Sequence, residues 1–285
     1  FQSLRLKCSI VLVRVTVPGP MARSLRDFIL RAVDEGYPAA IHIPHSFISI
    51  AKYRQWRTSE GESARWLFDF VMSFFSHSQG SGAWGMALIK GKSIASYCAE
   101  ADYSHFHLLA YLLTYWSPHD LVYRALCTPR HPLRLYCIGM DALDGITTVA
   151  AYADLAHELQ PRNKLLPVFS GVVLYNMGSI FQYLDYKARG KNFGKTFLAE
   201  PGSDVTRGAL LALGYVYFAR VFRQGRYRNQ MLVVLSLLEV FIEVLEDIFD
   251  FDAYEHVHKL VLPMLKVLRR SFALGPRAVQ DADKE

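Results

Sequence analysis

The sequence contains little cysteine and no closely spaced cysteine pair. Its four cysteines are Cys8, Cys98, Cys127 and Cys137, and no C-x-x-C occurs in the 285 residues. A zinc site or thioredoxin-type redox site built on such a pair is therefore disfavoured, and so is a disulfide framework, which is typical of short secreted chains. We interpret the four thiols as reduced and mostly buried.

Charged residues are also scarce. They make up 20% of the chain, against about 25% in an average soluble protein, while hydrophobic residues make up 52%. The net charge is +6, but the basic residues are scattered between apolar runs and no glycine–aromatic nucleic-acid motif accompanies them. Nucleic acid is therefore disfavoured as a partner, and the membrane lipids, with their anionic headgroups, are favoured.

Alternating strand-like patterns are absent after residue 20, and seven apolar stretches follow one another instead. They cover residues 36–51, 66–89, 105–116, 133–153, 165–184, 205–222 and 230–249. A membrane-crossing helix needs about 20 mainly apolar residues, and several of these stretches are shorter or contain charges. Two all-α interpretations stay open, a multi-span membrane protein and a soluble bundle with apolar core helices. We predict the membrane protein, in which helices satisfy every backbone polar group.

The two ends of the chain differ from the middle. Residues 1–34 are predicted to be an N-terminal extension, because their apolar part is short, contains Arg14 and leads into an amphipathic segment from Met21. Residues 35–250 would form the seven-helix domain. Residues 251–285 would be an amphipathic basic tail that lies on an anionic membrane surface or packs on a neighbour.

Basic residues in the linkers predict an orientation. The longer set of lysines and arginines falls in the linkers around residues 52–65, 118–134 and 187–207 and in the tail. The positive-inside rule places this set in the cytosol. The N-terminus would then be luminal and the C-terminus cytosolic.

Glycine interrupts the second and the fifth stretch. The second contains Gly80, Ser81 and Gly82, and the fifth contains Gly171, Gly178 and Ser179. Glycine costs roughly 1 kcal/mol in a helix interior compared with alanine, so these residues predict kinks whose freed carbonyl oxygens line a cavity and coordinate a cation. The alternative is that small residues only permit close helix packing.

A polar segment follows the third stretch. Pro118 ends the preceding helix, and Asp120 suits the N-cap of the next helix. Leu121, Tyr123 and Arg124 complete the pattern Pro-x-Asp-Leu-x-Tyr-Arg. The segment is predicted to be the hinge between two groups of three helices.

These features together resemble the trimeric intracellular cation (TRIC) channels. The resemblance rests on three-plus-three-plus-one stretches, the mid-span Gly80-Ser81, and the motif of Pro118, Asp120, Leu121, Tyr123 and Arg124, and it covers about residues 36–250. It implies two inverted three-helix repeats plus one helix, homotrimers in the endoplasmic reticulum or another organelle membrane, and one potassium-permeable pore in each protomer, without metal or cofactor. The implied pore-lining residues are Gly80, Ser81, Gly82, Asn176, Gly178 and Ser179.

The sequence departs from that family in the fourth stretch. Where the family carries basic residues that bind lipid phosphates, this chain has Asp141 and Asp144. As acids at the pore mouth, they would attract cations. Paired carboxylates also suit Mg²⁺ binding or acid–base catalysis, but no second acidic motif completes an enzyme site. The alternative function is a non-conducting, TRIC-like accessory subunit of a larger membrane complex.

Two further groups of polar residues have alternative interpretations. Glu239, Glu243 and Glu246 share one face of the seventh stretch. They would meet water, an arginine of a partner chain or each other in a trimer, or they would lie in the solvated end of a helix longer than the bilayer. Glu239 needs a partner if it lies in the bilayer. His105 and His107, like His256 and His258, would point to opposite helix faces, so we interpret them as surface or interface residues rather than metal ligands.

Overall fold

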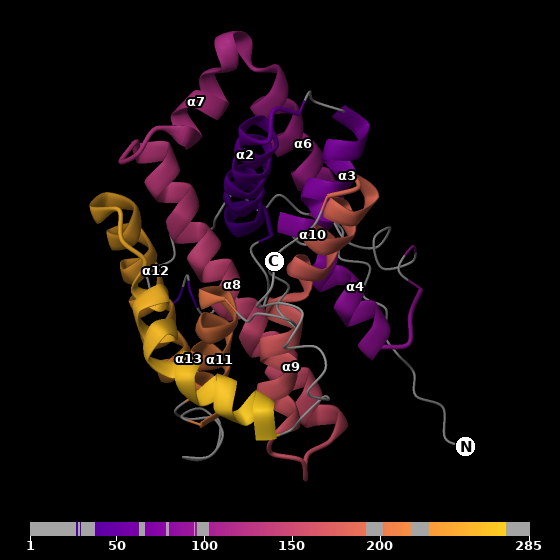
Figure 1. Cartoon of the computed structure of the whole chain (residues 1–285), viewed down its shortest axis with the longest axis vertical. Coiled ribbons are helices and arrows are strands. Elements are labelled where there is room, and N and C mark those ends of the chain that lie inside the picture. The colour runs from indigo at the N-terminus through magenta and orange to yellow at the C-terminus, as the bar shows by residue number, and fades with distance from the viewer. Residues whose placement is uncertain are drawn as a thin grey trace.

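The computed structural model of the chain describes residues 27, 29, 38–62, 66–77, 80–93, 95, 103–191, 202–217 and 228–271. Within these ranges every regular element is a helix and no strand occurs (Figure 1). The all-α prediction is therefore confirmed for this part of the chain. Most of the predicted N-terminal extension 1–34, and the tail beyond residue 271, lie outside the described residues.

The described helices follow the seven apolar stretches in order. The first three stretches give η2 (Pro38–His42) with α2 (Ile43–Ser59), α3 (Trp66–His77) with α4 (Gly80–Ile89), and α6 (Tyr103–Trp116). The next three give α8 (Pro132–Leu159), α9 (Leu166–Tyr175) with α10 (Met177–Ala188), and α11 (Ser203–Val216). The seventh gives α12 (Arg228–Phe249), and the predicted tail begins with α13 (Ala253–Ser271).

A short connection separates the two groups of three. It consists of η3 (Pro118–Asp120) and α7 (Leu121–Cys127). Asp120 has a left-handed backbone, with φ of 57°, and its side chain makes no capping hydrogen bond. Asp120 therefore occupies the N-cap position of α7, as predicted, but the predicted capping hydrogen bond of its side chain is not formed. The hydroxyl of Ser117 instead accepts a hydrogen bond from the Val122 N–H at 3.1 Å.

The longest helix, α8, lies at the centre of the molecule (Figure 1). Ile146, Val149 and Ala150 of α8 are fully buried, and they pack in one cluster with Tyr215 of α11 and Leu232 of α12. Pro132 begins α8, where its missing N–H costs nothing, and the ring of His131 accepts a hydrogen bond from the Leu133 N–H at 3.2 Å. This helix therefore connects both groups of three to α12.

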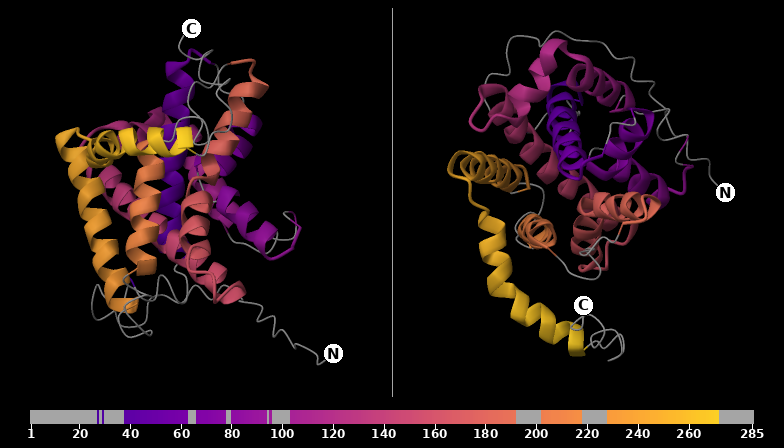
Figure 2. Two further views of the ribbon diagram at one scale, coloured as in Figure 1. Left: turned by 60° about the horizontal axis from the view of Figure 1, so that its bottom comes forward. Right: turned by 45° about the horizontal axis from the view of Figure 1, so that its top comes forward.

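The linkers that carry the longer basic set meet at one end of the molecule. Lys191, after α10, binds Glu60 after α2 at 2.6 Å, and Arg134 of α8 binds Asp247 of α12 at 2.6 Å. α13 crosses the ends of α11 and α12 at this end (Figure 2). The structure thus brings together the segments that the charge pattern assigned to one side.

Among the described residues, no single helix is both long enough and apolar enough to cross a membrane.

Candidate functional site

The second and the fifth apolar stretch each form two helices instead of one. α4 begins at Gly80, and α10 begins directly after Asn176, whose φ and ψ are −92° and 9°. The Asn176 N–H still donates to the Val172 carbonyl at 3.2 Å, and the Ser179 N–H donates to the Asn176 carbonyl at 3.1 Å. The chain therefore changes direction at Asn176 without losing these backbone hydrogen bonds.

The two helix breaks lie against each other. A Cβ atom on Gly178 would lie 2.5 Å from the carbonyl oxygen of Ser76 and 3.7 Å from Oγ of Ser81. Gln182 of α10 donates a hydrogen bond to the same Ser76 carbonyl at 3.3 Å. The structure thus brings Ser81, next to Gly80, close to Gly178 in the other half of the chain.

The polar groups at these breaks are largely occupied by protein partners. The Asn176 amide donates to the Val172 carbonyl at 2.8 Å, and the Ser179 hydroxyl donates to the Asn176 carbonyl at 2.7 Å. Ser81 and Asn176 are buried. Gly82 faces α8, because a Cβ atom there would lie 2.5 Å from the hydroxyl of Tyr152. In this conformation the break is a close-packed crossing, and a lining role for its six predicted residues stays a prediction.

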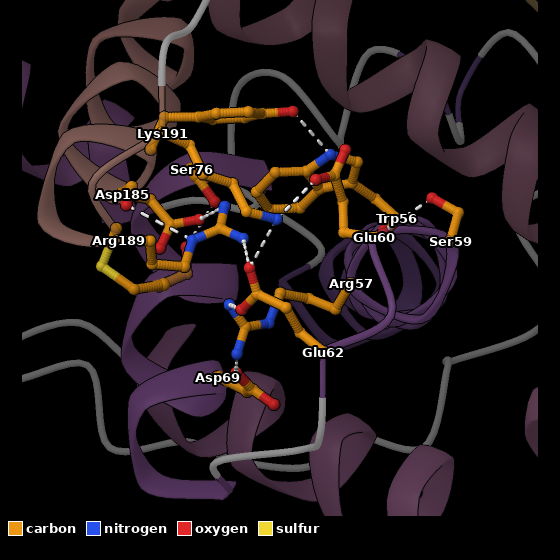
Figure 3. Close-up of polar contacts among 12 residues, drawn as sticks. Trp56, Arg57, Ser59, Glu60, Glu62, Asp69, Ser76, Asp185, Arg189 and Lys191 are labelled. Carbon is orange, nitrogen blue, oxygen red and sulfur yellow. Dashed lines mark hydrogen bonds and ion pairs between the residues drawn. The ribbon is translucent and has the colours of Figure 1, made fainter.

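A network of charged side chains ties the outer halves of the broken helices to α2 (Figure 3). Arg57 of α2 pairs with Glu62 and, at 3.4 Å, with Asp69 of α3. Arg189, after α10, binds Glu62 at 2.7 Å and Asp185 of α10 at 2.6 Å. Arg57 and Asp69 are almost fully buried. The network therefore fastens both α3 and α10 at the end where the basic linkers meet.

Glu62 is the shared carboxylate of this network. It also pairs with Lys191 at 2.8 Å, and the guanidinium of Arg189 stacks on the Trp56 ring at 4.3 Å. Partial burial by itself would raise the pKa of the Glu62 carboxyl. The hydrogen bonds from Lys191 and Arg189 and the charge of Arg57 outweigh burial and lower this pKa to about 2.

The two predicted pore-mouth acids face two histidines. Asp141 of α8 lies 2.6 Å from Nδ1 of His45 and 3.3 Å from Nζ of Lys52, both on α2. Asp144 lies 2.8 Å from Nδ1 of His42, at the end of η2. The acids are therefore paired with side chains of the first group of helices.

The glutamates of the seventh stretch have partners as well. Arg207 of α11 pairs with Glu239 and, at 2.6 Å, with Glu243. Glu239 also accepts a hydrogen bond from the hydroxyl of Tyr254 in α13. The interpretation of Glu239 as part of a solvated helix end is wrong, because the side chain is buried, and Arg207 is the partner that it required.

The polar motif after α6 contacts α2. Arg54 donates to both carboxylate oxygens of Asp120, at 3.2 and 3.1 Å, and to the Thr114 carbonyl at 2.7 Å. Its guanidinium lies 4.0 Å from the centre of the Tyr123 ring. Asp120 and Tyr123 therefore hold one arginine of α2, while Pro118 begins the turn and Leu121 and Arg124 are exposed.

Sequence reasoning missed the histidines and the network around Glu62. His42 and His45 lie in a stretch with no aspartate, glutamate, lysine or arginine, and Asp69 is the only acid in its stretch. An isolated ionisable residue in an apolar segment requires a partner, so these residues could have been singled out. His107 is buried and bonded to Ser73 at 3.1 Å, and His258 is buried and bonded to Thr206 at 2.8 Å. The interpretation of these two as surface or interface residues is wrong, because both are buried against side chains of the same chain, whereas His105 and His256 are exposed, as expected.

The described part of the chain contains no candidate metal centre. No group of three or more histidine, cysteine, aspartate or glutamate side chains there is placed to hold a metal ion. Cys137 is buried and Cys127 is partly buried, whereas Cys8 and Cys98 lie outside the described residues.

Comparison with known proteins gave matches only at the level of structure. No family model and no curated protein sequence matches the chain. A structure described as a TRIC counter-ion channel in calcium release superposes with a TM-score of 0.64 at 14% identity, covering 80% of this chain and 100% of that one. A trimeric intracellular cation channel from C. elegans with bound Ca²⁺ gives a TM-score of 0.55 at 15% identity, covering 79% and 98%.

A second C. elegans structure of such a channel, in the absence of Ca²⁺, gives a TM-score of 0.53 at 14% identity and covers 80% of this chain and 95% of that one. These likenesses extend over nearly the whole length of each channel. The resemblance predicted from Gly80-Ser81 and the Pro118–Arg124 motif is therefore confirmed at the level of the fold: this chain has the fold of the trimeric intracellular cation channels.

Proposed function

We propose that this chain is an integral membrane protein that conducts cations as a TRIC-like channel. The observation that carries the proposal is an arrangement of polarity opposite to that of a soluble domain. Arg57, Asp69 and Glu239 are only 1–3% exposed, whereas Phe169 and Phe241 are 64% and 60% exposed. Charges in a hydrocarbon environment face the protein interior, and large apolar side chains face lipid.

The exposed apolar side chains occur on many helices. They are found on α3, α6, α9, α11 and α12 and include Leu67, Val71, Leu109, Leu113, Leu213, Val234, Leu237 and Leu238. Single exposed apolar residues are normal on a soluble protein, but extended apolar surface indicates contact with a membrane or partner. This distribution supports a chain embedded in a membrane, and the proposal is that its seven apolar stretches cross the membrane as two inverted three-helix repeats plus one.

The proposed cation path runs beside the crossing of the two broken helices. Its lining would include Gly80, Ser81, Gly82, Asn176, Gly178 and Ser179, with Asp141 and Asp144 supplying negative charge at one mouth. The Glu62 network at the basic end would hold α3 and α10 together in the closed state. Opening then requires that the two outer half-helices separate.

The likeness to TRIC channels further suggests potassium as the ion, a homotrimer as the assembly and an intracellular membrane as the location. Transport would be passive and would need no cofactor. Membrane lipids would surround the apolar surface, and α13 would lie along the headgroups at the cytosolic end.

Reconstitution tests the proposal. The full chain in planar bilayers should pass potassium current, and the double variant Asp141→Asn, Asp144→Asn should lower the preference for cations because it removes two negative charges from the path. The matched control is Glu158→Asn, which removes an exposed acid at the end of α8. Absence of current from correctly inserted protein contradicts the channel, and unchanged selectivity in the double variant removes the acids from the path.

A second candidate function is a non-conducting accessory subunit of a larger complex. The pairing of Asp141 with His45 and Lys52 favours it, because carboxylates that are already neutralised attract a passing cation less. Such a subunit would give no current and would remain in a particle larger than a homotrimer.

A further inference from the structure

Two histidines and two aspartates form facing rows between the first and the fourth helical segment. His42 and His45 are three residues apart at the start of the first, and Asp141 and Asp144 are three residues apart on α8. Residues at this spacing lie on one helix face. We call these four residues the histidine–aspartate ladder. We infer that it is a proton-binding site that sets the sign of the charge in the proposed cation path, an inference that rests on the proposed function.

The ring of His45 has one engaged and one open nitrogen. Nδ1 lies 2.6 Å from Asp141, so in the neutral ring this nitrogen carries the hydrogen and donates it. Nε2 is buried and has no hydrogen-bond partner among the described residues. A neutral His45 therefore presents a free lone pair on Nε2, which is the atom that accepts a proton.

The ladder opens toward solvent at one end. The side chain of Lys52, which binds Asp141, is 50% exposed, whereas that of Asp144 is 8% exposed. A cavity of about 650 Å³ reaches Lys52, and its walls include Arg134 of α8 and Glu243 and Glu246 of α12. Water and protons in this cavity therefore lie next to the outer end of the ladder.

The charges that face the ladder come from each neighbouring element. α8 supplies Asp141 and Asp144, and α2 supplies Lys52. Beyond Lys52 lie Arg207 of α11 and Glu243 of α12, which pair with each other at 2.6 Å. α6 supplies the buried His107. On the other neighbouring helices, Asp69 of α3 pairs with Arg57, and Arg124 of α7 is exposed. Imidazoles ordinarily titrate between about pH 5 and 8, and the double histidine variant described below separates their contribution from that of the neighbouring Glu243 carboxyl.

Protonation changes the sign of the local charge. With both imidazoles neutral, the ladder and Lys52 carry one net negative charge, because two carboxylates outweigh one ammonium. With both imidazoles protonated, they carry one net positive charge. A constriction of negative charge favours cations and one of positive charge excludes them, so acidification should reduce cation passage.

The test compares full-length protein in planar bilayers at about pH 8.5 and about pH 5.5, a window that is extended upward because the facing carboxylates stabilise a protonated imidazole. The readout is the potassium-to-chloride permeability ratio, obtained from the reversal potential in unequal KCl. We expect this ratio to fall about tenfold in the wild type at the lower pH, because the charge in the path reverses. The double variant His42→Asn, His45→Asn should keep the higher ratio at both pH values, since the asparagine amide donates near the position of Nδ1 but does not titrate.

The control is His105→Asn, which removes an exposed histidine of α6 and should behave as the wild type. A wild-type ratio that is the same at both pH values overturns the inference and leaves the channel intact. A double variant that titrates like the wild type also overturns it. Absence of any current overturns the proposed function and the inference together. If the double variant does not elute at the same volume as the wild-type particle, it is not correctly assembled. The test then rests on the wild type at the two pH values and on the single variant His45→Asn.

Discussion

At the scale of single residues, several charged side chains are buried in the protein, and each has a partner of opposite charge. Taking an ion out of water costs several kcal/mol unless a partner and further hydrogen bonds compensate. Asp69, Asp185 and Glu239 are nearly inaccessible, and each has an arginine beside it, Arg57, Arg189 and Arg207 respectively. Arginine suits this role because its planar group bonds a carboxylate in two places and remains charged.

Glu62 gives a prediction at this scale. Its pKa in the folded state, about 2, lies below the usual value of about 4.3. Its contribution to stability is therefore complete above about pH 4.3 and is lost as the pH falls toward about 2, because the unfolded state then binds the proton more tightly. Thermal unfolding in detergent should show Glu62→Gln less stable than the wild type at neutral pH, with the difference shrinking below about pH 4.

The control for this prediction is Glu158→Gln, the same change at an exposed position. It should leave both the midpoint and its pH dependence near the wild-type values. If Glu62→Gln and the wild type lose stability in parallel on acidification, ionisation of the Glu62 carboxyl does not contribute to the stability of the network.

At the scale of elements, the two helix breaks depend on contacts between them. A helix interrupted in an apolar surrounding must satisfy the freed backbone groups. At Asn176 the side-chain amide and the Ser179 hydroxyl do so locally, and Gln182 bonds the Ser76 carbonyl of the other break. Glycine at position 178 allows the backbone of α10 to approach this carbonyl.

Gly178→Ala tests that close approach. A Cβ atom would lie 2.5 Å from the Ser76 carbonyl oxygen, which is backbone and cannot turn aside. We expect a loss of about 1–3 kcal/mol in unfolding free energy, the usual range for overpacking, measured by thermal unfolding in detergent. Gly202→Ala is the matched control, because a Cβ atom there meets nothing within 4 Å. Equal effects of the two substitutions would contradict the close contact.

At the scale of the whole molecule, the exposed apolar surface requires a cover of lipid or of further protein chains. The bundle exposes apolar side chains on several helices, and α13 adds Leu260 and Met264, which are exposed, while Tyr254 and His258 anchor it to the bundle. Extended apolar surface of this kind is covered by lipid or by other chains. The number of chains in the native particle therefore separates the two proposed functions.

Mild detergent extraction of the full-length protein gives that number. For a TRIC-like channel we expect a particle of three identical chains, measured by native mass spectrometry. Co-purification with other chains in a fixed ratio, in a larger particle, would support the accessory subunit instead. A detergent-independent monomer would contradict both membrane proposals.

The sequence by itself was sufficient for the order and type of the helices. Apolar periodicity and the glycine and proline positions are local properties, so the seven stretches, the interruptions near Gly80 and Asn176, and the turn at Pro118 could be predicted. The resemblance to TRIC channels followed from the spacing of the same local features, and the structural likeness at 14–15% identity agrees with it.

Only the tertiary structure decided which charges are partners. Glu62 and Arg189 are 127 positions apart, His45 and Asp141 are 96 apart, and Arg207 and Glu239 are 32 apart. Such pairs depend on the rotation and register of packed helices, which a one-residue shift changes by about 100°. For this reason the acids at 141 and 144 were predicted, whereas the histidines that bind them were found only in the folded chain.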